Sequence, residues 1–186
     1  MNLSEYYKDD IERVLISQTD LSNRIGEIAK QLDKDYKGKD LLVIGILKGA
    51  IFTITNLLEK MQKNVDLDFM TLSSYGDKTR STGNIKLVMD LDRNVENINI
   101  LIVEDIIDTG LTMKWLLDYL YKKKASSVEI FTLLEKKEGH RHFVNPKYVG
   151  FQVPNEFVVG FGLDYGQYYR NIPYIGVLKE SIYKGE

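Results

Sequence analysis

Helical and strand-like patterns of apolar residues alternate along this chain. Apolar residues recur at helical spacing over 19–32, which predicts an amphipathic helix capped by Ser17 or Thr19. The same spacing predicts helices over 50–62 and over about 112–124. Short apolar runs predict strands at 41–47, 65–72, 100–103, 128–134, 148–153, 157–161 and 174–178.

This alternation predicts an α/β fold, with a mainly parallel central sheet flanked by helices, as one domain over residues 1–186. Connections between parallel strands are right-handed, and ligands bind beyond the carboxyl ends of the strands. Here those ends are Leu47, Asp105 and Leu134, and charged or glycine residues follow each of them. We therefore expect the chemistry at that edge of the sheet.

Composition narrows the class of protein. Of 186 residues, 44% are hydrophobic and 28% are charged, which suits one core and a solvated surface. Cysteine is absent, which excludes thiolate metal sites, and we treat His140 and His142 as surface residues. A net charge of −2 predicts no nucleic-acid partner. The chain shows no signal-peptide pattern and no apolar stretch of membrane-spanning length, so we expect a cytoplasmic protein without membrane contact.

The densest chemistry follows the apolar run 100–103, which leads directly into Glu104, Asp105 and Asp108 and then into Thr109-Gly110-Leu111-Thr112. A strand-to-helix turn of this kind offers hydroxyls, backbone N–H groups and a helix N-terminus, which favour a phosphate. Carboxylates beside it would repel that phosphate unless cations or sugar hydroxyls lie between them. One ligand that combines sugar, phosphate and Mg²⁺ would suit both the turn and the carboxylates.

With this segment the chain resembles the phosphoribosyltransferase family, whose signature is a hydrophobic strand, an acidic pair and a D-[ST]-G-x-T-type loop. The resemblance implies the type I phosphoribosyltransferase fold, with a small hood built from the N-terminal segment and the C-terminal part. It implies that Thr109, Gly110, Leu111 and Thr112 hold the 5-phosphate of phosphoribosyl pyrophosphate.

The resemblance also gives roles to the three acids of the signature. Glu104 and Asp105 would bind the ribose hydroxyls and order a first Mg²⁺. Consecutive strand residues point to opposite faces, so both can act only if the chain turns there. Asp108 is the candidate catalytic base for the proton on purine N7.

Two further segments extend the likeness on the pyrophosphate side. Leu47-Lys48-Gly49 resembles the family's pyrophosphate loop, where a strained peptide exposes backbone N–H groups to the leaving group. Residues of about 74–84 resemble the mobile loop that closes over the site, with Ser74 and Tyr75 as its working residues. Closure would exclude water from a ribosyl cation-like state.

The base-binding side is carried by two more segments. Lys136 matches the family lysine that donates a hydrogen bond to the purine 6-oxo group and so disfavours adenine, although its neighbours Glu135 and Lys137 depart from the family pattern. Residues 157–170 resemble the base and metal wall. Their implied roles are stacking on the purine for Phe157, backbone contacts to the base edge for Val158, a second Mg²⁺ for Asp164 and pyrophosphate contact for Arg170.

Within the family, the closest likeness is to bacterial-type enzymes that act on hypoxanthine and guanine. It implies transfer of the 5-phosphoribosyl group from phosphoribosyl pyrophosphate to a 6-oxopurine in purine salvage, with Mg²⁺ as cofactor and a homodimer or homotetramer as the assembly. A xanthine-preferring enzyme stays open, because one substituent separates xanthine from guanine. A non-catalytic regulator on the same fold would bind nucleic acid, for which it would need a basic surface or an added domain.

Overall fold

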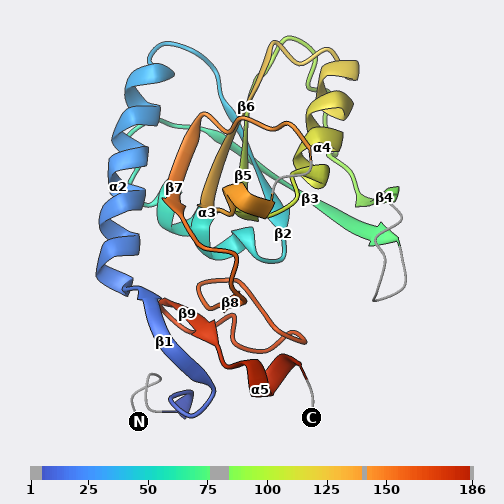
Figure 1. Cartoon of the computed structure of the whole chain (residues 1–186). Coiled ribbons are helices and arrows are strands. Elements are labelled where there is room, and N and C mark those ends of the chain that lie inside the picture. The colour runs from blue at the N-terminus through green and yellow to red at the C-terminus, as the bar shows by residue number, and fades with distance from the viewer. Residues whose placement is uncertain (1–5, 76–83, 140–141, 185–186) are drawn as a thin grey trace.

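The computed structural model describes residues 6–75, 84–139 and 142–184, and it arranges them around two sheets (Figure 1). The larger sheet has six strands in the order β4-β3-β2-β5-β6-β7. Every neighbouring pair is parallel except β3 and β4, so the prediction of a mainly parallel sheet is confirmed. Its strands are β2 (Leu42–Leu47), β3 (Asp66–Tyr75), β4 (Asn84–Met89), β5 (Asn99–Ile107), β6 (Ser127–Glu135) and β7 (Tyr148–Gln152).

Helices cover both faces of this sheet because its central strands are apolar on both sides. Helices α2 (Gln18–Asp35) and α3 (Ala50–Leu58) share one core cluster with Val43 and Leu101. Helix α4 (Leu111–Lys122) shares another with Ile44. In Figure 1, α2 and α4 accordingly lie on opposite sides of the sheet. The α/β expectation is confirmed.

The helix ends refine the sequence prediction. Ser17 is the N-cap of α2, and its hydroxyl accepts a hydrogen bond from the Asp20 N–H at 3.1 Å, which decides between the two expected caps. Helix α3 ends at Leu58, earlier than the helix expected over 50–62. No helix of the described residues combines the length and apolar character needed to cross a membrane.

The second sheet was not predicted. Strands β1 (Ile11–Ile16), β9 (Ile175–Leu178) and β8 (Val158–Val159) form it with antiparallel pairing, and a short helix α5 (Glu180–Tyr183) follows β9. It lies below the large sheet in Figure 1 and joins the two ends of the described chain. We call these strands and α5 the small sheet unit.

The strand expected over 157–161 is therefore wrong in both length and place. It contains only Val158 and Val159, and it pairs with β9 instead of completing the parallel sheet. The physical reason lies in the next three residues: Gly160, Phe161 and Gly162 have φ values of 99°, 47° and 104°, a left-handed backbone that ends a strand.

Candidate active site

Strand β5 extends beyond the predicted strand at 100–103, and it includes the two adjacent acidic residues. It continues to Ile107, so Glu104 and Asp105 both lie within the strand and the turn comes only after them. The chain therefore does not turn at the pair, which was the condition for both acids to act, but the two carboxyls still lie close enough to interact with each other. Glu104 lines a cavity at the start of α4, whereas the carboxylate of Asp105 lies against Gly49. The two acids thus serve adjoining parts of the site.

The cavity gathers most of the residues expected around a phosphorylated sugar. Its volume is about 290 Å³. It is lined by Glu104, Asp108 and loop 109–112, together with Ser73 from β3 and Ile85 from β4. Hydroxyls, backbone N–H groups and two carboxylates therefore face one space, which fits a ligand that has both phosphate and sugar hydroxyls.

Loop 109–112 owes its shape to Gly110. This residue is the N-cap of α4 with φ 79°, and a Cβ on it would lie 3.0 Å from the carbonyl oxygen of His142. The His142 N–H also donates a hydrogen bond to the Thr109 carbonyl at 3.1 Å, so this neighbouring segment holds the loop. The glycine N-cap has no side chain to offer, and the Leu111 N–H makes only a long hydrogen bond of 3.5 Å to Thr109 Oγ1, so the start of α4 can present backbone N–H groups to an anion.

Burial governs the ionisation of the acidic pair. Glu104 and Asp105 are each only 9% exposed. Burial raises the pKa of Glu104 well above its ordinary range, and the adjacent Asp105 carboxylate raises it further. Burial also raises the pKa of Asp105, while the positive charge of Arg170 acts to lower it. The pair therefore favours ligands that bring positive charge or hydrogen-bond donors.

Three distant segments meet at backbone level beside Asp105. A Cβ on Gly49 would lie 1.6 Å from Asp105 Oδ2. Gly162 has φ 104°, and a Cβ on it would lie 2.1 Å from the carbonyl oxygen of Gly49. The peptide bond between Leu47 and Lys48, just before this contact, is cis. The predicted pyrophosphate loop is thus packed between the acidic pair and the predicted base and metal wall.

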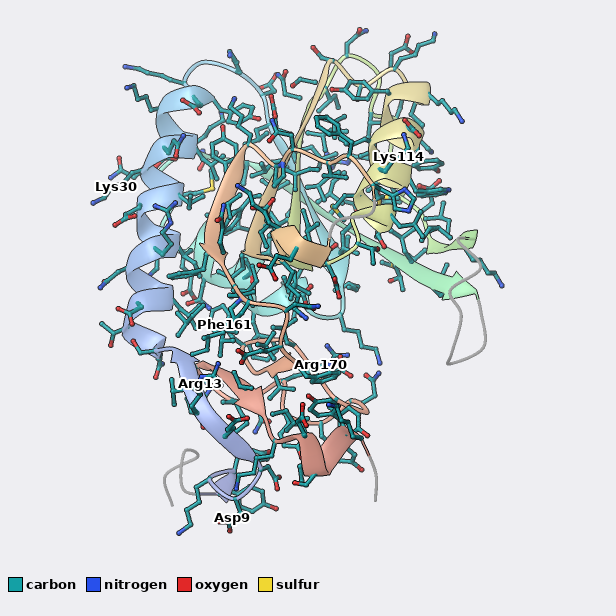
Figure 2. The ribbon with its side chains drawn as sticks, viewed as in Figure 1. Asp9, Arg13, Lys30, Lys114, Phe161 and Arg170 are labelled. Atoms are coloured by element: carbon teal, nitrogen blue, oxygen red, sulfur yellow. The ribbon has the colours of Figure 1, made fainter. Side chains whose placement is uncertain are left out.

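A polar network joins this loop to Arg170, which Figure 2 labels beside the small sheet unit. The Arg170 guanidinium donates to the Gly162 carbonyl at 2.6 Å and pairs with Asp164 at 2.8 Å. Arg170 and Lys48 each donate to Gln167 Oε1 at 3.2 Å. The Gln167 N–H in turn donates to Asp164 Oδ2 at 2.9 Å. Two of the predicted pyrophosphate-binding cations are therefore held at one side chain.

The predicted base-selecting lysine lies beside the predicted catalytic acid. Lys136 is buried, and its Nζ lies 4.0 Å from Asp108 Oδ2. Its backbone N–H donates to the Ile107 carbonyl at 3.0 Å, which ties the end of β6 to the end of β5. Asp108 itself lies against Gly139 in the 3-10 helix η1 (Lys137–Gly139), where a Cβ would come within 2.3 Å of Oδ1.

Phe157 occupies a different environment from the loop cavity. Its ring stacks on Tyr183, with centroids 4.7 Å apart and planes at 23°, and meets Tyr165 edge-on at 5.6 Å and 89°. Val158 is buried in β8, where it pairs with Val177. Phe157 lines a second, open cavity together with Arg13, Asn155, Glu156, Lys179 and Tyr183.

Part of the predicted mobile loop falls outside the described residues. Ser74 and Tyr75 end β3, where their backbones pair with Ile85 and Asn84, but their side chains and residues 76–83 are not described. His140 also lies outside the described residues. Sequence reasoning missed the cavity residue Ser73, the close packing of Gly139 and the bridging role of Gln167. Of these three residues, only Gly139 gave a signal in the sequence that could have been used.

The donor chemistry fits a shared magnesium ion better than a metal held by protein alone. Among the described residues, no group of three or more His, Cys, Asp or Glu side chains is arranged to hold a metal. Mg²⁺ commonly binds one or two carboxylates together with substrate phosphates and waters. Glu104, Asp105 and Asp164 offer only oxygen ligands near the predicted phosphate sites, which suits that mode.

Comparison with known proteins gives concordant matches. A phosphoribosyl transferase domain model matches residues 17–166. Hypoxanthine-guanine phosphoribosyltransferase of Streptococcus thermophilus is 47% identical over 174 residues, covering 94% of this chain and 97% of that protein. The bifunctional protein TilS/HprT of Listeria innocua is 47% identical over 180 residues, but this chain spans only 28% of its length. A solved hypoxanthine phosphoribosyltransferase from Staphylococcus aureus shares 42% identity with a TM-score of 0.94, covering 98% of this chain and 99% of that one.

Proposed function

The chain belongs to the phosphoribosyltransferase family, in its hypoxanthine-guanine group, and we propose that it transfers the 5-phosphoribosyl group of phosphoribosyl pyrophosphate to hypoxanthine or guanine. The products would be IMP or GMP and pyrophosphate, as in purine salvage. The observation that carries the proposal is the single cavity that Glu104, Asp108 and loop 109–112 share. It brings together groups for a phosphate, for sugar hydroxyls and for a proton.

At the phosphate end, loop 109–112 would hold the 5-phosphate through backbone N–H groups and the hydroxyls of Thr109 and Thr112. This phosphate does not react, so its binding energy can orient the ribose C1 toward the base. Although the chain does not turn at the pair, the carboxyls of Glu104 and Asp105 interact with each other, so both would accept hydrogen bonds from the ribose 2- and 3-hydroxyls. Burial raises the pKa of both carboxyls. Hydrogen-bond donors of the ligand would stabilise the ionised carboxylates and so oppose that rise.

At the leaving-group end, Lys48, Gly49 and Arg170 would bind the pyrophosphate. In the reaction the bond from C1 to the pyrophosphate oxygen breaks and the bond from C1 to the purine N9 forms. Negative charge grows on the pyrophosphate as it leaves. The Lys48 ammonium and the Arg170 guanidinium, both held at Gln167 Oε1, would stabilise that charge.

At the base end, Lys136 would donate to the purine 6-oxo group, Phe157 would stack on the ring and Val158 would contact the base edge through its backbone. Asp108 would take the proton that N7 releases as N9 forms its new bond. The distance of 4.0 Å between Lys136 Nζ and Asp108 Oδ2 is compatible with both groups reaching the same purine edge. The Lys136 ammonium can donate a hydrogen bond to the 6-oxo group, but it has no acceptor for the amino group of adenine.

Mg²⁺ is the cofactor that this chemistry calls for. Glu104 and Asp105 would order one ion at the ribose and diphosphate, and Asp164 would hold a second. When bound, the metal neutralises phosphate charge that the protein cations leave uncompensated. Removing it with a chelator should abolish turnover.

Several architectural predictions remain part of this proposal. The small sheet unit would be the hood of a single domain, and the loop of about 74–84 would close over the ligand. We also expect a homodimer or a homotetramer without a nucleic-acid or membrane partner. The cytoplasmic location stays a prediction as well.

The test is pyrophosphate release from phosphoribosyl pyrophosphate and Mg²⁺ with each of hypoxanthine, guanine, xanthine and adenine. We expect turnover with hypoxanthine and guanine and none with adenine. Preference for xanthine would revise the substrate but keep the chemistry. No release with any of the four bases would overturn the proposal, and salt-sensitive binding of the protein to nucleic acid would then favour the regulator.

A further inference from the structure

The ring of Phe157 is fixed by aromatic neighbours from two other segments. Tyr183 stacks on it with centroids 4.7 Å apart and planes inclined by 23°. Tyr165 meets it edge-on at 5.6 Å and 89°. Tyr183 lies in α5, more than twenty residues along the chain from Phe157, so no sequence pattern announces the contact. One face of the Phe157 ring is covered by Tyr183.

The chain leading into helix α5 is tied to Phe157, the residue directly before β8. The Leu178 N–H donates to the Phe157 carbonyl at 2.9 Å, directly before the helix begins. The next residue, Lys179, is bonded to the segment before β1. Its backbone N–H donates to the Asp10 carbonyl at 2.9 Å, and its Nζ donates to the Asp9 carbonyl at 2.6 Å. These bonds place Tyr183 against Phe157 through the backbone of the small sheet unit.

Because Tyr183 covers one face of the Phe157 ring, a base could stack only on the other face. In Figure 1, β8 lies between α5 and the large sheet. Asp108 and Lys136 directly follow β5 and β6 of that sheet. A purine that accepts a hydrogen bond from Lys136 would reach Phe157 from the side of the large sheet. Tyr183 would then back the opposite face, and the three rings would form one stack.

We propose that Tyr183 is a positioning residue for the purine, because it holds the Phe157 ring in the orientation in which the base stacks on it. This inference rests on the proposed function. Without Tyr183 the Phe157 ring would turn more freely, and the base would have to order it on binding. A stacked aromatic pair changes an equilibrium by about two- to tenfold, so we expect an effect of that size on base affinity alone.

The test compares the Michaelis constants of the two substrates in three variants. Tyr183→Ala and Tyr183→Leu should raise KM for hypoxanthine by about two- to tenfold and leave KM for phosphoribosyl pyrophosphate unchanged. Tyr183→Phe, which keeps the ring, should behave as the wild type. Ile182→Ala is the matched control, because Ile182 packs against the same core cluster from the same helix.

Equilibrium binding of GMP gives a readout that does not depend on turnover, and circular dichroism shows whether each variant folds. Weaker GMP binding in Tyr183→Leu, restored in Tyr183→Phe, would support the inference even if Tyr183→Ala fails to fold. Unchanged KM for the base, or equal changes for both substrates, would overturn it. So would tighter base binding in Tyr183→Ala, which would mean that Tyr183 occupies the place of the base. A wild-type protein that neither turns over nor binds GMP would overturn the proposed function and this inference together.

Discussion

The carboxylate of Asp105 lies directly on the backbone of Gly49, where a Cβ would come within 1.6 Å of its Oδ2. The Gly49 carbonyl oxygen also lies close to Gly162, where a Cβ would be 2.1 Å from it. A Cβ would displace the buried Asp105 carboxylate at Gly49 and would collide with backbone at Gly162, so this packing favours glycine at both positions. The contact between Asp105 and Gly49 therefore fixes the position of the predicted pyrophosphate loop relative to the acidic pair.

Gly49→Ala should damage both the fold and the chemistry. Overpacking of this kind costs about 1–3 kcal/mol, so we expect a lower melting temperature and at least a roughly tenfold loss of kcat/KM. Gly26→Ala is the control, because the nearest atom to a Cβ at Gly26 is Lys60 Cδ at 3.6 Å. That change in the helix interior should stabilise the protein by about 0.5–1 kcal/mol and keep activity. Wild-type activity in Gly49→Ala would refute the close contact.

Asp108→Asn should separate binding from turnover. The amide keeps the shape of the side chain but cannot accept a proton, so kcat should fall by about 10²–10⁴. Binding of phosphoribosyl pyrophosphate with Mg²⁺, followed by calorimetry, should stay close to that of the wild type. Asp118→Asn is a suitable control, since Asp118 is an exposed acid of α4 whose Oδ2 lies 3.8 Å from Lys114 Nζ. Parallel losses of binding and turnover in Asp108→Asn would contradict a role as base.

Local patterns predicted the large sheet and the backbone of the turn at 109–112 well. The apolar run 100–103 is buried on both faces, and the turn after it has the backbone that its glycine predicts. Such features depend on residues that are close in sequence, so periodicity and turn chemistry describe them. The signature of loop 109–112 belongs to this class, and the family resemblance followed from it.

Features made by distant segments could not be predicted in this way. Strand β1, near the start of the chain, pairs with β9, near its end. The burial of β1 does not alternate, because only Ile11 and Ile16 at its ends are buried. The stack of Phe157 on Tyr183 depends on the same long-range pairing. Gln167 has a left-handed φ of 74° that a glutamine gives no reason to expect. Tertiary packing determined all three.

Lys136→Ala should relax the choice of base more than it weakens phosphoribosyl pyrophosphate binding. A hydrogen bond from a charged donor contributes about 1.5–3 kcal/mol, so kcat/KM for hypoxanthine should fall by roughly 10- to 100-fold. The penalty against adenine should shrink in the same variant. Lys137→Ala is the neighbouring control, because that lysine is exposed whereas Lys136 is buried. Equal losses for both substrates would show that Lys136 does not select the base.

The buried acidic pair should make the metal-free protein less stable as the pH rises. Burial raises the pKa of Glu104 and of Asp105 in the folded state. Between the ordinary carboxylate pKa and the raised one, the folded chain keeps a proton that the unfolded chain has lost. The free energy of unfolding therefore falls through that window, by up to about 1.4 kcal/mol per pH unit for each proton.

Melting temperatures measured with a chelator from about pH 5 to about pH 8 would test this sign. Glu104→Gln cannot ionise at that position, so its melting temperature should fall less with pH than that of the wild type. Glu138→Gln, at an exposed position, should follow the wild-type curve. Saturating Mg²⁺ and phosphoribosyl pyrophosphate should flatten the wild-type curve, because the bound ligands stabilise the ionised pair. A wild-type curve that rises with pH, with Glu104→Gln rising in parallel, would show that burial does not govern these carboxyls.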